Sequence, residues 1–186
     1  MLAVDVDITP LVGAARQGDP EAWDQLLHRY QLPLFTFVFG LVRHEQTSLD
    51  IVQETFINAL RHLETLRADE RFGSWLFGIA HQKCVQHWRR TSRESRVVDA
   101  ERPLPEIASA PVEDPSEWLI RQEREAEFLA ALDRLPPPQR TVVLLHFLEE
   151  FPLDEISGIT GSPLGTVKSR LHYAKRLLRQ WLAETP

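Results

Sequence analysis

The chain has 186 residues, of which 43% are apolar, and a formal net charge of −6 from 21 basic and 27 acidic side chains. This suits one ordinary globular domain or two small ones, and the negative charge excludes a protein that coats nucleic acid by bulk charge. Cys84 is the single cysteine, which excludes an internal disulfide framework. The N-terminal segment lacks the basic start and apolar run of a signal peptide, so we expect a cytoplasmic protein.

The charges are unevenly distributed. Residues 1–70 hold five arginines and eleven acids, and residues 99–127 hold three arginines and nine acids. By contrast, residues 81–96 hold five basic residues and one acid, and residues 161–183 hold five basic residues and no acid. Local basic patches of this kind can meet phosphate groups even on an acidic molecule.

Helix signals dominate the N-terminal half. Asp19 and Pro20 predict an N-cap and a first helical residue, and Pro33 predicts a break or kink before the helix resumes over residues 35–43. The next helix has the clearest apolar periodicity, which predicts one buried stripe: Leu49, Val52, Phe56, Ala59, Leu63 and Leu66. Residues 67–74 read as a loop, after which Ser74 is expected to cap a helix from Trp75 to about Arg90.

Four prolines and no apolar stripe mark residues 97–117 as a linker. Helical patterns return over about residues 117–135 and again after the three prolines at 136–138, and no alternating strand pattern is found. The expected fold is therefore all-α, with two small helical domains over residues 1–96 and 118–186 joined by a flexible linker.

The C-terminal stretch has the pattern of a helix-turn-helix. A short helix, LDEISGIT, is followed by a turn with Gly161, and then by a longer helix with Ser162 as cap and Pro163 at its first position. Its apolar residues predict one buried face (Leu164, Val167, Leu171, Ala174, Leu178 and Trp181), so that polar residues project from the other side (Thr166, Ser169, Arg170, Tyr173 and Arg176). This polar set suits the major groove of DNA, although a solvated basic helix in an ordinary bundle would show the same pattern.

The motifs resemble those of the extracytoplasmic-function sigma factors. The runs LP..QR at 135–140 and GTVKSRL at 165–171 are similar to region 4 of that family. DIVQETF at 50–56 is similar to region 2.2, and WLFGIAHQKCVQHWRR at 75–90 is similar to regions 2.3 and 2.4. The resemblance covers about residues 10–93 and 118–182, with its two parts in the family's order.

The resemblance implies a sigma factor, a non-enzymatic subunit that needs no cofactor and directs RNA polymerase to promoter DNA. Region 2 would bind the clamp of the largest polymerase subunit and open the −10 element. Region 4 would bind the flap of the second-largest subunit and read the −35 element. An anti-sigma factor is a further expected partner.

Carried over by position, the family's roles fall on three sets of residues. The polymerase-binding set is Asp50, Gln53, Glu54 and Ile57. The −10 set combines the loop thought to receive a flipped base with the basic helix after it: Arg67, Arg71, Phe72, Lys83, Gln86, Trp88, Arg89 and Arg90. The −35 set is Thr166, Lys168, Ser169, Arg170, Tyr173 and Arg176.

The sequence also departs from the family pattern. The lead into region 2.2 is Thr47-Ser48-Leu49 instead of an acidic, alanine-containing one. In region 2.4, His81-Gln82 stands where the family usually has Arg-Asn, Gln86 where it usually has Asp, and Trp88 where an aliphatic residue is usual. The −10 preference of typical members is therefore not inherited. Gly158 and Thr160 replace better helix formers in the first helix of the helix-turn-helix, at a cost of about 1 kcal/mol for the glycine.

Other chemistries are weaker interpretations. His81, Cys84 and His87 are spaced as in a metal site, but a helix would spread them over about 120° and no fourth ligand is evident, so a helix surface with a partly buried cysteine is favoured. Trp75, Phe77 and Trp88 could stack on bases or pack in a core. No nucleophile motif or phosphate-binding loop is present.

The alternative function is a helix-turn-helix regulator that binds DNA without polymerase. The DIVQETF helix and the basic patch at 81–96 argue against it, since a simple sensor domain needs neither. A purely protein-binding helical module, of the anti-sigma kind, would not account for the basic reading helix.

Overall fold

The computed structural model describes residues 7–94 and 127–183, and every regular element in them is helical, as predicted. The N-terminal bundle (residues 7–94) consists of α1 (Thr9–Arg16), α2 (Pro20–Val42), α3 (Glu45–His62) and α4 (Phe72–Glu94), with 3-10 turns at Leu63–Thr65 and Asp69–Arg71. The C-terminal bundle (residues 127–183) consists of a helical segment at 127–134, α6 (Pro137–Val143) with a π-helical turn at Leu144–Leu148, α7 (Leu153–Thr160) and α8 (Leu164–Ala183). The predicted linker, residues 97–117, lies outside the described residues.

Helix α2 begins as predicted but does not break at Pro33. The Asp19 side chain accepts hydrogen bonds from the backbone N–H groups of Glu21 and Ala22 at 2.9 and 3.5 Å. The helix then continues through Pro33 to Val42, so of the two predicted alternatives, a break or a kink, the break is wrong. Tyr30, Leu34 and Phe37 are all buried on either side of the proline. Their packing offsets the roughly 3 kcal/mol cost of an interior proline.

The buried face of α3 is rotated from the predicted stripe. Val52, Phe56, Ala59 and Leu63 are buried as expected, but Leu49 is 46% exposed. Ser48 and Thr55 are buried in addition, because each hydroxyl donates to the carbonyl four residues earlier, at 2.8 and 2.7 Å. Two polar residues therefore lie on the core side, a feature that a count of apolar residues cannot detect.

The start of α4 also differs from the prediction. The helix begins at Phe72, and Ser74 lies inside it with its hydroxyl donating to the Arg71 carbonyl at 3.2 Å, so Ser74 is not the cap. Phe72 is fully buried and contacts the rings of Trp23 and Tyr30, at centroid distances of 6.3 and 5.4 Å. The aromatic core thus fixes the beginning of α4.

The predicted helix-turn-helix is confirmed. Gly161 ends α7 in the left-handed conformation, with φ of 63°, which glycine adopts without steric cost. The backbone N–H groups of Thr166 and Val167 donate to the Pro163 carbonyl at 2.8 and 3.0 Å, so the helix begins one residue later than predicted and Pro163, not Ser162, stands at the cap position. Val167, Leu171, Ala174 and Leu178 form the buried face. Leu164, 39% exposed, does not join it.

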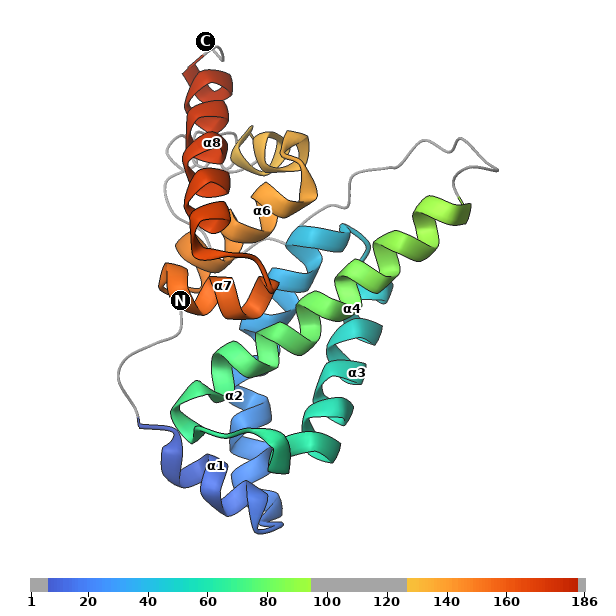
Figure 1. The fold of residues 1–186 in the computed structure, drawn as a ribbon. Coiled ribbons are helices and arrows are strands. Elements are labelled where there is room, and N and C mark those ends of the chain that lie inside the picture. The colour runs from blue at the N-terminus through green and yellow to red at the C-terminus, as the bar shows by residue number, and fades with distance from the viewer. Residues whose placement is uncertain (1–6, 95–126, 184–186) are drawn as a thin grey trace, which may run out of the picture.

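The two bundles contact each other. Figure 1 shows α7 next to α4, with α8 rising above α7 and away from the N-terminal bundle. The buried residues of both bundles form one continuous apolar cluster. The two expected domains therefore pack directly against each other and share one core.

Candidate protein and nucleic-acid interfaces

The polymerase-binding set predicted on α3 lies together on an exposed face. Asp50, Gln53 and Glu54 are exposed, and Ile57 is 41% exposed. The rotation of α3 adds two apolar neighbours that the sequence pattern did not assign to this face, Leu49 at 46% and Leu60 at 55% exposure. We call these six residues the α3 surface. Apolar side chains beside polar ones are typical of a protein-binding surface.

An ion pair links this surface to α4. The Nζ of Lys83 lies 2.7 Å from Oε2 of Glu54. Lys83 belongs to the predicted −10 set and Glu54 to the polymerase-binding set, so the structure joins one member of each. Asp50 is paired more locally, and its Oδ1 accepts a hydrogen bond from Gln46 at 3.2 Å.

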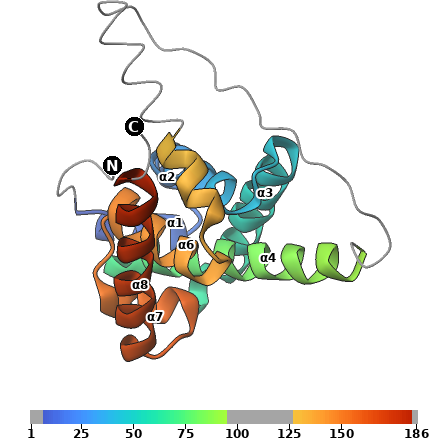
Figure 2. The ribbon, with the colours of Figure 1, turned by 90° about the horizontal axis from the view of Figure 1, so that it is seen from above.

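The C-terminal half of α4 carries the first basic patch. Gln86, Arg89 and Arg90 are exposed, while Lys83 and Trp88 are half-buried. Figure 2 shows this half of the helix projecting beyond the other helices. Such a projection gives access to a ligand as large as DNA.

The rest of the predicted −10 set is divided. Arg67 and Arg71 are exposed before α4, but Phe72 is fully buried in the aromatic core and offers no surface to a base. Phe77 is also fully buried, and Trp75 is half-buried against the core. Phe72 and Phe77 are therefore packing residues in this structure. Of Trp75, Phe77 and Trp88, Trp88 lies nearest the exposed C-terminal end of α4.

Helix α8 carries the second basic patch. Lys168, Ser169, Tyr173 and Arg176 are exposed, and Thr166 is half-buried. The Arg176 guanidinium lies 5.2 Å from the centre of the Tyr173 ring, a cation–π contact that orders two exposed side chains. The outward face predicted from the helical period is thus largely present.

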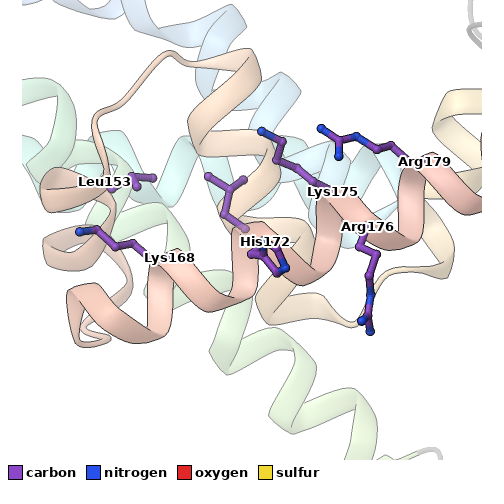
Figure 3. A pocket seen from close by; sticks show the side chains of 7 residues that line it. Leu153, Lys168, His172, Lys175, Arg176 and Arg179 are labelled. Atoms are coloured by element: carbon purple, nitrogen blue, oxygen red, sulfur yellow. The ribbon is translucent and has the colours of Figure 1, made fainter.

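Three basic residues that the prediction omitted extend this patch. His172, Lys175 and Arg179 line a shallow hollow along α8, together with Lys168, Arg176, Leu153 and Leu171 (Figure 3). Spacings of three and four residues place the omitted residues in one row with Lys168. The acid-free composition of residues 161–183 was the signal that could have identified them.

Arg170 is partly covered by its own bundle. It is half-buried, and its NH1 donates to the Ser162 hydroxyl at 2.8 Å. It also lies near His81 of α4. Burial, and secondly the positive charge of Arg170, lower the pKa of His81.

The cysteine of the His81, Cys84 and His87 pattern on α4 is a buried core residue. Cys84 has no exposed surface, and burial raises its pKa to about 12. Residues 7–94 and 127–183 contain no cluster of three or more His, Cys, Asp or Glu residues that could hold a metal ion. Within the same ranges, no helix is long and apolar enough to cross a membrane.

Two family models match the chain in the order of its bundles. The model described as sigma-70 region 2 matches residues 26–94, and the model described as sigma-70 region 4 matches residues 125–178. The RNA polymerase sigma-H factor of Pseudomonas aeruginosa is 30% identical over 173 residues, which cover 90% of each chain. The RNA polymerase sigma factor SigV of Bacillus subtilis is 34% identical over 145 residues, covering 78% of this chain and 81% of that protein.

Solved structures with a similar fold cover both bundles. The sigma factor RpoE, in complex with the anti-sigma factor NepR from Bartonella quintana, has a TM-score of 0.71 and 24% identity, covering 88% of this chain and 98% of that one. CnrH, in complex with the cytosolic domain of CnrY, has a TM-score of 0.69 and 22% identity, covering 96% and 99%.

Proposed function

Because the chain belongs to the extracytoplasmic-function sigma factors of the sigma-70 family, we propose that its two bundles divide promoter recognition between them. Sigma factors are transcription initiation factors and not enzymes. In this proposal region 2 comprises residues 1–96 and region 4 comprises residues 118–186, with residues 97–117 as the linker. The protein acts in the cytoplasm, where polymerase and promoter DNA are found.

Region 2 binds the clamp of polymerase core through the α3 surface. The observation that carries this assignment is the exposure of Leu49, Ile57 and Leu60 beside the acidic residues Asp50 and Glu54. Exposed leucine and isoleucine side chains gain free energy when a partner covers them, at about 25 cal/mol per Å² of apolar area.

Region 2 then opens the −10 element with α4 and the segment before it. The exposed members are Arg67, Arg71, Gln86, Arg89 and Arg90, with Lys83 and Trp88 beside them. Arginines hold the phosphate backbone, and Trp88 is placed to stack on an unpaired base. Phe72 is left out of this role because it is buried.

Region 4 reads the −35 element with α8 and binds the polymerase flap. Ser169, Tyr173 and Arg176 form the outward row that enters the major groove, while Lys168, His172, Lys175 and Arg179 form the adjacent row that holds phosphates. Arg170 reads a base edge when its guanidinium exchanges the Ser162 hydroxyl of the same helix-turn-helix for the DNA. An anti-sigma factor is the expected regulatory partner, in line with the solved complex of similar fold between the sigma factor RpoE and the anti-sigma factor NepR.

The test is the affinity of the full chain for polymerase core. We expect Gln53→Ala and Leu60→Ala each to weaken binding by about 1–3 kcal/mol, since both lie at the centre of the proposed contact. Gln25→Ala and Leu32→Ala are matched controls, because both residues are exposed on α2, Leu32 at 69%. Equal affinities of all four variants and the wild type would remove the clamp assignment.

A polymerase-independent regulator is the competing function, and a transcription assay separates the two. A sigma factor makes polymerase core initiate at a promoter that core alone does not use. A regulator of the simple helix-turn-helix kind would bind the promoter but leave core inactive. The match of residues 26–94 to sigma-70 region 2 favours the first outcome.

A further inference from the structure

Arg16, the last residue of α1, binds the segment between α3 and α4 at two points. Its NH2 group donates to the Leu66 carbonyl at 3.0 Å and to Oδ1 of Asp69 at 2.5 Å. Its NH1 group donates to Oδ2 of the same carboxylate at 3.4 Å, so the guanidinium contacts both carboxylate oxygens. A Cβ at Gly13, on the same face of α1, would lie 3.9 Å from Oδ2. The segment thus rests against α1 (Figure 1), and the two bound points flank residues 67 and 68.

Helix α1 is itself well fixed in the N-terminal bundle. Val12 and Ala15 are buried in the apolar core. The backbone N–H groups of Gly18 and Asp19 donate to the carbonyls of Ala15 and Ala14 at 3.0 and 3.1 Å, which ties the end of α1 to the start of α2. Gly18 makes this turn possible, because its φ of 88° is open to glycine without steric cost. A side chain at the end of α1 therefore has a defined position.

Apolar burial fixes the two ends of the segment but not its middle. Leu66 and Phe72 are buried, whereas none of residues 67–71 is buried. Within the middle, the Arg71 N–H donates to the Ala68 carbonyl at 3.0 Å and closes one 3-10 turn. A single turn of this kind is weak without tertiary support. Arg16 supplies that support from another helix.

The support comes from outside the part of the chain that matches region 2. The sigma-70 region 2 model covers residues 26–94, which include the segment but not α1. The segment carries Arg67 and Arg71, the two exposed arginines assigned to the −10 element. Their presentation therefore depends on a helix to which neither the sequence pattern nor the family match gives a function.

We propose that Arg16 is a positioning residue for recognition of the −10 element. Its bridge from Leu66 to Asp69 fixes the backbone between them, so that Arg67 and Arg71 meet the DNA strand in one orientation. Arg16 acts through the segment, since its guanidinium is occupied by the carbonyl and the carboxylate. A site discriminates between ligands when supporting contacts fix its side chains. The inference rests on the proposed function for the role of the two arginines.

Two variants break the bridge with opposite changes in charge. Arg16→Gln removes a positive charge, and Asp69→Asn removes a negative one. If charge alone mattered, the first would weaken DNA binding and the second would strengthen it. If the bridge positions the segment, both should lower the discrimination between bases. The pair is partly solvated, with side chains 33% and 17% exposed, so we expect both variants to fold. Arg61→Gln and Glu64→Gln are matched controls, because these exposed residues give the same changes in charge.

Amide hydrogen exchange in the free full chain tests the bridge without polymerase or DNA. The reporter is the Arg71 N–H, which closes the 3-10 turn. The reference is the Ser48 N–H, which donates to the His44 carbonyl at 2.9 Å at the start of α3. We expect exchange at Arg71 to become about tenfold faster in both bridge variants, with no change at Ser48. The two controls should match the wild type at both amides.

Holoenzyme reconstituted from polymerase core and the full chain tests the reading of DNA. Selection from a library randomised over the −10 element gives the sequence that the wild type prefers. Open-complex formation is then compared between this sequence and its single-base variants. We expect the ratio of the two rates at one position to fall about tenfold in both bridge variants and to stay unchanged in both controls. The ratio is taken within each holoenzyme, so a difference in affinity for core cancels.

Three results would overturn the proposal. Unchanged exchange in both bridge variants would show that Arg16 does not fix the segment. Faster exchange with unchanged discrimination would show that the fixed backbone is not needed for reading. Changes in discrimination of opposite sign in Arg16→Gln and Asp69→Asn would assign the effect to charge.

A failure of the proposed function has a different signature. Arg67→Ala and Arg71→Ala would then leave −10 discrimination unchanged, and the positioning role would be wrong together with the assignment of the segment. The exchange rates would still show whether Arg16 fixes the backbone.

Discussion

Lys83 Nζ and Glu54 Oε2 lie 2.7 Å apart, and this ion pair ties the basic helix α4 to the candidate polymerase surface on α3. Lys83 has a side chain only 15% exposed, whereas Glu54 is 65% exposed. The Lys83 ammonium is thus largely covered, whereas the Glu54 carboxylate remains accessible to a partner.

The effect of Glu54 on the stability of the fold can be distinguished from its effect on polymerase binding. Because Glu54 is largely solvated, we expect Glu54→Gln to lower the free energy of unfolding by no more than about 1 kcal/mol. Polymerase affinity should fall by a larger amount if the carboxylate is buried in the contact. Urea unfolding and core-binding titrations of the same variant give both values. A loss of stability that accounts for the whole loss of affinity would make Glu54 a structural residue.

Arg170 and Lys168 should affect DNA binding in different ways. Arg170→Ala is expected to weaken binding to a preferred −35 duplex by about 1–3 kcal/mol and to relax the preference at one base pair. Lys168→Ala should weaken binding evenly across sequences. It should also reduce the slope of log affinity against log salt concentration by about one, because one phosphate contact is lost. Competition titrations with selected and scrambled duplexes distinguish the two. An unchanged preference in Arg170→Ala would remove Arg170 from the base-reading set.

Glu149 should make the stability of the protein depend on pH. Its side chain is buried, Oε2 receives no hydrogen bond within the described part of the chain, and burial raises its pKa from 4.5 to about 7. The folded state therefore binds the proton more tightly than the unfolded state, so this contribution to stability is present at low pH and is lost as the pH rises from about 4.5 to about 7. Glu149→Gln should accordingly stabilise the fold at pH 8 by about 1–3 kcal/mol and change little at pH 4.

Urea unfolding of Glu149→Gln at both pH values checks this expectation. Glu150→Gln is the matched control, since the neighbouring carboxylate is exposed. If the two variants show the same pH dependence as the wild type, Glu149 is not the titrating group.

Cys84 should be unreactive in the folded protein. Its thiol is fully buried with a pKa raised to about 12, and the thiolate is the reactive form. We expect reaction with a disulfide reagent at pH 8 to be at least about 100-fold slower than that of a cysteine placed at exposed Gln31. Full reaction in denaturant confirms that the thiol is present. Prompt reaction of the folded wild type would point to an accessible cysteine and a redox role.

The sequence by itself determined the helical class, the order of the elements and the helix-turn-helix. These follow from local rules: an N-cap at Asp19, a left-handed glycine at 161, and apolar spacing along α8. The exposed positions of Asp50, Gln53 and Tyr173 follow equally from helical periodicity. Local chemistry is sufficient here because each signal lies within one or two turns of the residue that it places.

Only the tertiary structure decided features that depend on distant neighbours. Helix α2 passes through Pro33 because buried residues on both sides hold it, and Phe72 joins a core with Trp23 and Tyr30 instead of lining a loop. Leu49 faces outward because two hydroxyls satisfy their own backbone and occupy the buried face. Arg43 meets Asp133 across 90 positions of sequence. A pattern read along the chain contains no information on such pairs, since their energy comes from surfaces that folding brings together.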